Sequence, residues 1–380
     1  MKITNKLISE AKKYWKECKA KSDYDYCAAV FRERLVKSGI PADNPAPGEE
    51  EYVRYWQQFH NKVEPYTYRY FQRICGNNPH IVPEDIAHRY IETVLNPVRF
   101  RAFYSDKNMY DRYLHPSSIL PAIYMYRING GAIYFKLSNR VVSTLESAED
   151  VASMLGESVS KAVLKPSIDS NSGRKVMLFE RNGRVLKNKE EFLLSGSFLE
   201  QFGSDWVLQE AITQHPYLQQ FSKTSVNTIR AMTYRSIEDD TCSVFSAVLR
   251  IGKNGSFVDN LFGGGGFLTI DLNNGELGQC VYNRFWQSFP EINDIDFMNG
   301  RYILPFWDKI VDFAKDIAYQ IPHARLLAQD ITVDSEGNPR LIEFNVNSFD
   351  WAMSMTSGQI PFGDRFDEVI NYCLKFKDEL

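Results

Sequence analysis

Cysteine and histidine are scarce in this sequence, and neither residue type forms a spacing that metal sites commonly use. Six cysteines and six histidines occur in 380 residues, with no Cys-x-x-Cys pair and no His-Glu-x-x-His pattern. These missing spacings argue against a zinc site. We therefore interpret the cysteines as reduced, mostly structural thiols in a reducing compartment.

Long apolar runs and a strong excess of one charge are also missing. No stretch is long or apolar enough to cross a bilayer, and the charged N-terminus lacks the apolar core of a signal peptide. The net charge of −4 argues against a general nucleic-acid binder. We expect a cytoplasmic protein, and we interpret Lys377–Leu380, which spells an ER-retention signal, as the coincidental end of a charged helix.

The composition that is present predicts a large soluble protein with two or three structural units, since 44% of its residues are apolar. Apolar residues at helical spacing predict that residues 1–104 are mainly helical. The first helix is rich in lysine. It either docks on its own domain or contacts a membrane surface, an acidic partner or a glycosyltransferase.

The most informative stretch runs from Gln329 to Asn347. Two apolar strands flank a Ser-Glu-Gly-Asn-Pro turn, which predicts a β-hairpin. We place Asp330 at the start of the first strand, and Glu343 and Asn345 on one face near the end of the second. A closed hairpin would bring their oxygen atoms together. Mg²⁺ prefers such oxygen ligands when phosphates complete its coordination shell. The alternative is a surface hairpin whose polar face meets water.

This hairpin resembles the metal-binding hairpin of ATP-grasp enzymes. In that family Asp, Glu and Asn hold two Mg²⁺ ions against the phosphates of ATP. The resemblance implies that Asp330, Glu343 and Asn345 are the metal ligands, and that ATP and Mg²⁺, with two ions, are the cofactors.

Further segments follow in the family's order. Asp106-Lys107 and the strand ending in Lys165 are similar to the segments whose lysines reach ATP phosphates, although Lys107 alone would pass for an exposed lysine. The Ser/Gly turn after Lys165 resembles the phosphate-covering loop, and the Gln-Glu-x-Ile segment resembles the adenine-reading hinge. The family's ribose-binding acid is missing, which leaves Gln214 or His215 at that place. The implied nucleotide-binding residues are Lys107, Lys165, Ser170, Ser172, Gly173, Gln209, Glu210, Ile212 and His215.

Arginine in a strand at a pocket is costly unless it meets an anion. Arg230 resembles the arginine that neutralises the transferring phosphoryl group, and Arg250 is a second candidate. Some ATP-grasp ligases carry an arginine two residues before the metal-binding Asp, where this sequence has Ala328. The catalytic charge-stabilising role therefore falls on Arg230 or Arg250.

Four consecutive glycines follow Asn260 and Phe262, an arrangement that costs conformational entropy. The run is either a wide bulge or a place where the backbone approaches a ligand. It is similar to the substrate-side wall of the sugar-transfer-associated ATP-grasp proteins, a resemblance that covers roughly residues 105–375. The implied substrate-side residues are Asn260, Gly264, Gly265 and Asn347.

The resemblance implies an α+β fold of the ATP-grasp type, in which two subdomains clamp ATP. In the sequence this fold follows the helical N-terminal region. We expect the boundaries 1–104, 105–208 and 209–380. The implied activity is an ATP- and Mg²⁺-dependent ligase that joins a small-molecule carboxylate to an amine through an acyl phosphate, in the modification of a cell-surface carbohydrate or polymer. The alternatives are a kinase that phosphorylates a hydroxyl and a nucleotide-binding scaffold for a glycosyltransferase.

Overall fold

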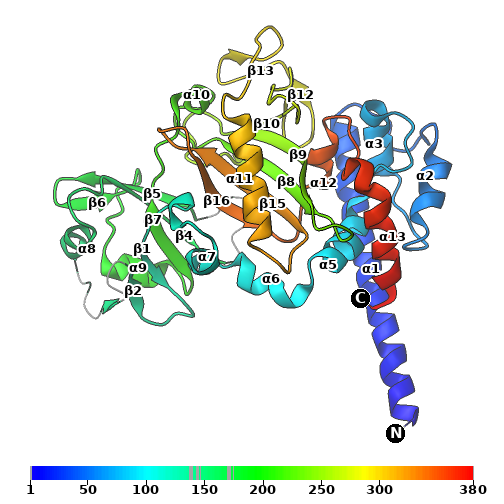
Figure 1. Ribbon diagram of the computed structural model, residues 1–380, viewed down its shortest axis with the longest axis horizontal. Helices are drawn as coiled ribbons and strands as arrows, with labels where there is room; N and C mark the ends of the chain where they lie inside the picture. Colours follow the sequence, from blue (N-terminus) through cyan, green and yellow to red (C-terminus); the bar gives the residue numbers. More distant parts are fainter. Residues whose placement is uncertain are drawn as a thin grey trace.

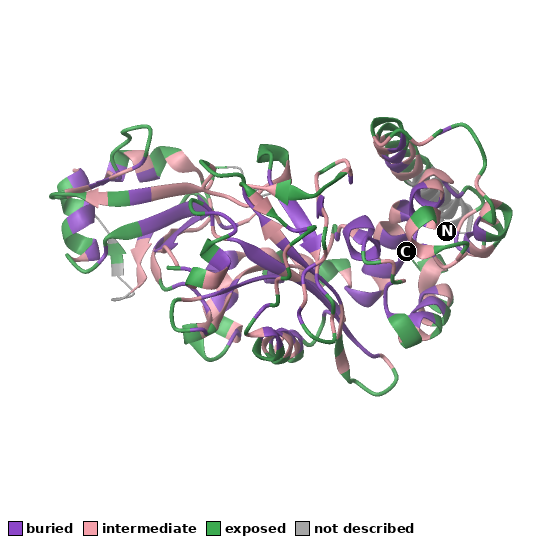
Figure 2. Ribbon diagram, turned by 90° about the horizontal axis from the view of Figure 1, so that it is seen from above, coloured by how far each residue is buried: buried purple, intermediate pink, exposed green. Residues whose placement is uncertain are grey.

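Three parts lie in a row along the molecule: a small sheet, a central sheet and a helical layer (Figures 1 and 2). The computed structural model describes residues 2–136, 140–142, 145, 147–168, 173 and 175–379. Within that part of the chain, none of the helices combines the length and the apolar character needed to cross a bilayer.

The helical layer is built mainly by the N-terminal region, as its apolar spacing predicts. Its aromatic core includes Tyr52, Trp56, Tyr68 and Phe71, all fully buried. The helices are α1 (Lys2–Lys37), α2 (Glu49–Trp56), α3 (Tyr66–Cys75), α4 (Glu84–Ile86), the π-helix η1 (Ala87–Ile91), α5 (Glu92–Leu95) and α6 (Val98–Ser105).

A short connection then leads to the small sheet. Asp106 accepts a hydrogen bond from the backbone of Asn108 and so caps the turn that begins with Lys107. The sheet is antiparallel in the order β3-β2-β1-β7-β4-β5-β6, and α8 begins at a capping box made by Ser147 and Asp150. The elements are η2 (Lys107–Met109), α7 (Tyr110–Tyr113), η3 (Ser117–Ile119), β1 (Ile123–Arg127), β2 (Ile133–Phe135), β3 (Arg140–Val142), α8 (Ala148–Leu155), β4 (Lys161–Pro166), β5 (Met177–Asn182), β6 (Val185–Lys187), α9 (Gly196–Phe202) and β7 (Trp206–Glu210).

The central sheet is also antiparallel, in the order β12-β11-β10-β9-β8-β15-β16, and the predicted hairpin closes one of its edges. The elements are α10 (Pro216–Gln219), β8 (Thr228–Arg235), β9 (Cys242–Ile251), η5 (Leu261–Gly263), β10 (Gly266–Thr269), β11 (Val281–Tyr282), β12 (Ser288–Phe289), β13 (Glu291–Ile292), β14 (Ile295–Asp296), α11 (Trp307–Tyr319), β15 (Leu326–Val333), β16 (Pro339–Asn345), α12 (Trp351–Met355), η6 (Gly363–Arg365), α13 (Phe366–Phe376) and η7 (Lys377–Glu379).

The two faces of the central sheet are covered by different layers, because successive side chains of a strand point to opposite faces. On β8, Ile229 and Ala231 join the core under α11, whereas Met232 and Tyr234 join the core of the helical layer. Neighbouring strands follow the same rule: Val248, Leu326 and Ala328 face the helical layer, and Ala247, Leu249 and Leu327 face α11.

By alternation, Arg230, Arg250 and Asp330 lie on the same sheet face as the residues that pack under the helical layer. These three side chains, however, line a cavity and do not join that core. One sheet face is therefore apolar where helices cover it and charged where it borders that cavity. This places the three charged side chains on one surface, because their strands are neighbours in the order β9-β8-β15.

One detail of the C-terminal part differs from the prediction. Asp330 is the fifth residue of β15, whereas we expected it at the start, because the strand already begins at Leu326. After the hairpin the chain forms α12, which Asp350 caps by accepting a hydrogen bond from the backbone of Met353. The predicted α+β fold with a helical N-terminal region is confirmed, and the three predicted domain boundaries stay a prediction.

Candidate active site

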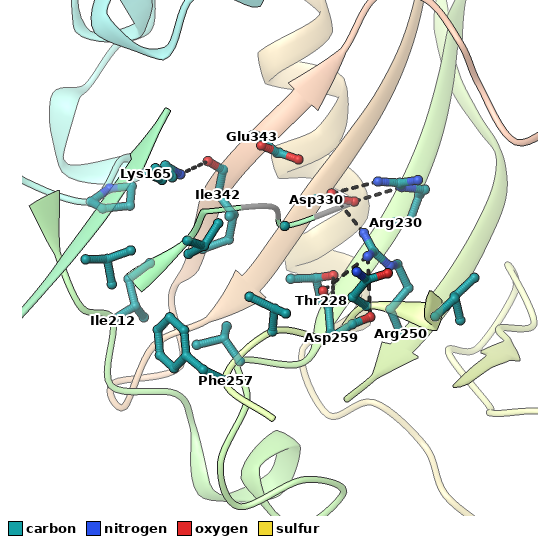
Figure 3. A pocket seen from close by; sticks show the side chains of 18 of the residues that line it. Lys165, Ile212, Thr228, Arg230, Arg250, Phe257, Asp259, Asp330, Ile342 and Glu343 are labelled. Carbon is teal, nitrogen blue, oxygen red and sulfur yellow. Dashed lines mark hydrogen bonds and ion pairs between the residues drawn. The ribbon is translucent and has the colours of Figure 1, made fainter. Parts of the chain in front are cut away.

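A cavity of about 320 Å³ lies between the small sheet and the central sheet (Figure 3). The small sheet contributes Lys165 from the end of β4 and Gln209 from the end of β7. The central sheet contributes Arg230 from β8, Asp330 from β15 and Glu343 from β16. Lys165 and Glu343, which are 178 positions apart in the sequence, therefore line one cavity, because the two sheets face each other across it.

Asp330 is the centre of an ion-pair network. Its two carboxylate oxygens accept hydrogen bonds from Nε and Nη2 of Arg230, each at 2.8 Å, and Nη1 of Arg250 donates a third at 3.1 Å. Burial would raise the pKa of Asp330, but Arg230 and Arg250 outweigh it and hold that pKa below its ordinary value. Asp330 is therefore a carboxylate at neutral pH.

Two lysines face the hairpin from the opposite side of the cavity. Lys107 Nζ lies 3.1 Å from an oxygen of Glu343, and Lys165 Nζ donates a 3.4 Å hydrogen bond to the carbonyl of Ile342. Burial, with the charge of Lys107, lowers the pKa of Lys165 to about 8. Burial would raise the pKa of Glu343, but Lys107 outweighs it and lowers that pKa. The cavity thus concentrates positive charge around two carboxylates, as a polyphosphate site requires.

Asp259 and Thr228 complete the network, and sequence reasoning assigned them no role. Nη2 of Arg250 lies 3.2 Å from Oδ1 of Asp259, and the Thr228 hydroxyl donates to the same carboxylate. Burial raises the pKa of Asp259, against the effect of Arg250. The available signal was the position of Asp259 directly before Asn260 in the glycine-rich run.

The remaining wall of the cavity is mostly apolar. Val163, Val176 and Ile212 line it beside the Gln209–Glu210 segment, and Phe257 and Ile342 also contribute. An apolar slot next to a charged one suits a ligand with a flat ring at one end and anionic groups at the other.

A family model described as "Sugar-transfer associated ATP-grasp" matches residues 85–364, which is most of the chain. The chain belongs to this family. A search of curated proteins gave no match. The predicted resemblance is therefore confirmed at the level of the family.

Solved structures with a similar fold include ATP-grasp enzymes, all at low identity. An ADP complex of purK, N5-carboxyaminoimidazole ribonucleotide synthetase, is 11% identical over 66% of this chain and 46% of that chain, with a TM-score of 0.36. The ATP-grasp ligase PsnB, complexed with a precursor peptide and AMPPNP, is 13% identical over 73% and 62%, with a TM-score of 0.36. D-alanine–D-alanine ligase from Bacillus anthracis is 13% identical over 73% and 69%, with a TM-score of 0.37. The match spans less than two thirds of the first two chains, so we take no substrate from them.

The hairpin of this ATP-grasp protein fits a metal ion that is shared with phosphate groups. Asp330 and Glu343 are cross-strand partners, and neighbouring cations keep both ionised. Asn345 pairs with Ala328 and lies two residues beyond Glu343. Among the described residues, no cluster of three Asp, Glu, His or Cys side chains forms a self-contained metal site. The oxygen donors present suit Mg²⁺ only if a ligand supplies the rest of its shell.

The structure brings most of the predicted site residues of this ATP-grasp protein to the same place. Lys107 reaches Glu343, and a second set lines the cavity directly: Lys165, Gly173, Gln209, Glu210, Ile212, Arg230, Arg250, Asn260, Asp330 and Glu343. Ser170 and Ser172 lie outside the described residues.

Other predicted residues lie elsewhere. His215 uses Nδ1 to accept a hydrogen bond from Tyr217 N at the start of α10, and Gln214 donates to Thr332 Oγ1 and the carbonyl of Asn227. Gly264 and Gly265 line a neighbouring groove. Asn345 and Asn347 are not among the residues that line the cavity, whereas the adjacent Ser348 is.

Glu92 of α5 holds the chain that follows the hairpin, a role the sequence did not indicate. This buried carboxylate accepts hydrogen bonds from Ser348 N at 2.7 Å, Phe349 N at 3.1 Å and Trp351 Nε1 at 2.8 Å. Asn96 donates a hydrogen bond to the carbonyl of Val346, the residue directly after β16. The helical layer therefore fixes the wall of the cavity to which Ser348 belongs.

His88 is the cation that balances Glu92, and it gives a testable pH dependence. Its Nδ1 lies 2.6 Å from Glu92 Oε1. Burial would lower the pKa of His88, but Glu92, with Glu84 and Asp350, raises it to about 9. Because the folded pKa exceeds the unfolded value, the stabilisation is complete below about pH 6.5 and is lost as the pH rises through 9.

We expect His88→Gln to lower the free energy of unfolding by about 1 kcal/mol at pH 6 and by much less at pH 10. A shift of this size in a fully buried group would correspond to about 3 kcal/mol, but a third of the ring is exposed to solvent. Urea denaturation at both pH values measures the difference. His60→Gln is the control, since His60 has no ion pair in the described structure. An equal loss at both pH values would contradict the assignment.

Proposed function

We propose that this protein is an ATP- and Mg²⁺-dependent ligase that joins a carboxylate to an amine through an acyl phosphate. The observation that carries the proposal is the cavity in which Lys165, Arg230 and Arg250 surround two ionised carboxylates of one hairpin. Membership of the ATP-grasp family supports the same conclusion.

The residues divide into a nucleotide end and a phosphate end. The apolar slot beside Gln209 and Ile212 would take the adenine ring, and Lys107 and Lys165 would hold the phosphates. Asp330, Glu343 and Asn345 would hold Mg²⁺, which when bound neutralises phosphate charge and orients the terminal phosphoryl group. We expect two ions, as in the family that the hairpin resembles.

The proposed reaction has two steps. An oxygen of the substrate carboxylate attacks the γ-phosphorus, the bond to the β-phosphate oxygen breaks, and ADP leaves. The amine nitrogen then attacks the acyl carbon, phosphate leaves, and the nitrogen loses a proton. The guanidinium groups of Arg230 and Arg250 lie beside Asp330, where they would stabilise the negative charge spread over the transferring phosphoryl oxygens.

The substrates we propose are a small-molecule acid and an amine, an amino acid or sugar derivative, in the cytoplasmic assembly of a carbohydrate or cell-surface polymer. The description of the family as associated with sugar transfer supports this setting. The N-terminal helix α1, whose sequence is rich in lysine, would supply a contact with a membrane surface or a glycosyltransferase.

Trapping with hydroxylamine tests the proposal. The protein is incubated with Mg²⁺, ATP and a panel of amino acids and uronic acids, with hydroxylamine as the amine, and the products are measured by mass spectrometry. A ligase gives ADP, phosphate and a hydroxamate of one acid. A kinase gives ADP and a stable phosphorylated alcohol without a hydroxamate. Nucleotide binding without any ADP formation would instead favour the scaffold.

A further inference from the structure

A second groove, of about 370 Å³, adjoins the candidate active site. Leu261 and Phe262 of η5 line both the groove and the cavity, so the two are continuous at this segment. The other side of the groove is the hairpin formed by β11 and β12. A ligand lying in the groove would therefore reach the phosphate end of the cavity past Phe262.

Several aromatic side chains in the groove are exposed to solvent. Phe262 is 68% exposed and Phe289 is 45% exposed, and Tyr282 and Phe285 also line the groove. Exposed apolar side chains that gather in one groove, unlike single ones scattered over a surface, mark a candidate binding site. They suit the apolar C–H faces of sugar rings, which pack flat against aromatic rings.

Arg284 supplies a cation that forms no ion pair among the described residues. Its charge nevertheless reaches Glu33 of α1, whose pKa is lowered mainly by Lys37 and to a smaller degree by Arg284. Its guanidinium carbon lies 5.4 Å from the centre of the Phe262 ring and 4.4 Å from that of Phe285. Lys253 lies beside Gly264, which lines the groove, and Glu291 is the acidic residue of the lining. A guanidinium stacked on aromatic rings keeps its donors available for an anionic ligand.

The helical layer holds this groove in a preformed shape. Trp286, at the tip of the hairpin, is buried, and its ring packs 4.9 Å from that of Phe31. Tyr70 Oη donates a 2.6 Å hydrogen bond to the carbonyl of Trp286, and Asn283 accepts hydrogen bonds from the backbone of Phe285 and Gln287. A preformed site loses little conformational entropy when it binds a ligand.

We propose that the groove binds an acidic oligosaccharide whose terminal sugar carries the carboxylate that reacts in the cavity. This inference rests on the proposed ligase function, and it names the class of acid. An extended peptide is a poorer occupant, because the exposed edge strand β12 has only two residues with which a peptide backbone could pair. A neutral glycan would form no ion pair with Arg284.

Isothermal titration calorimetry without ATP tests the groove separately from catalysis. The ligands are acidic tetrasaccharides, oligogalacturonate and hyaluronate fragments, and a neutral maltotetraose of equal length. We expect an acidic tetrasaccharide to bind, and Phe262→Ala and Arg284→Gln each to weaken that binding about tenfold, the value of one stacking or cation contact. Phe192→Ala, a 52% exposed phenylalanine beside the small sheet, is the matched control.

The outcomes distinguish this inference from the ligase proposal. If no acidic tetrasaccharide binds, if maltotetraose binds equally well, or if Arg284→Gln binds with unchanged affinity, the groove assignment is overturned. Hydroxamate formation from a free monosaccharide acid would still support the ligase in that case. Acid-selective binding that both variants weaken supports the groove, even if hydroxylamine trapping then shows that the protein is not a ligase.

Discussion

Glu343→Gln is expected to lower the rate of ADP formation by about three orders of magnitude while leaving the fold intact. Glutamine keeps the size of the side chain and can still accept a hydrogen bond from Lys107, which lies 3.1 Å away. It removes the negative charge that we assign to metal binding beside the phosphates. Losing one preorganised charge at a phosphoryl-transfer centre costs about 10²- to 10³-fold or more in rate.

The matched control is Glu336→Gln, in the exposed turn of the same hairpin. It makes the same chemical change, but Glu336 lies outside the cavity lining. ADP release in a coupled assay and thermal unfolding are measured for both variants. We expect equal melting temperatures and full activity in Glu336→Gln. Near-normal turnover by Glu343→Gln would show that this carboxylate is not needed for catalysis. That result would contradict our assignment of the metal site.

The hairpin could be predicted because its signals are local. The alternation of Ile331 and Val333 with polar residues and the turn at 335–339 predict the strand type and the pairing near the turn. A register shift between Asp330 and Ile331, which the sequence did not indicate, then brings Asp330 opposite Glu343. The start of β15 was misplaced for a physical reason as well. Leu326 and Leu327 are both buried, one on each face of the sheet, so that part of the strand shows no alternation.

Contacts between distant segments could not be predicted in this way. Arg230 and Asp330 are 100 residues apart, and nothing in either segment indicates that β8 and β15 are neighbours. Glu92 is a similar case. Its sequence signal is that of an ordinary helical glutamate, yet it is buried and binds a loop about 256 residues further along. The carboxylates of the hairpin followed from a local pattern and the cations of the site from the family resemblance, whereas the partners of these charges depended on the topology.

Asp330→Ala is expected to lower the free energy of unfolding by about 3–5 kcal/mol, the usual cost of removing one partner from a buried ion pair. The side chain of Asp330 is only 4% exposed, and both guanidinium groups that it binds are largely buried, at 18% for Arg230 and 13% for Arg250. Removing the carboxylate leaves these cations close together without their shared anion. Lost activity in this variant would therefore not by itself identify a metal ligand.

A double-mutant cycle separates the structural part of this effect from the catalytic part. Arg250→Met in the Asp330→Ala background removes one of the two cations that Asp330 bound, and with it their mutual repulsion. Urea denaturation should therefore show that the double variant recovers part of the lost stability. Asp259, which also binds Arg250, retains the Thr228 hydroxyl as a donor in that background. ADP formation should stay absent in the double variant, because the carboxylate needed for metal binding is still missing. Strictly additive losses of stability would show that the network is not coupled, and recovered turnover would show that Asp330 is needed only for folding.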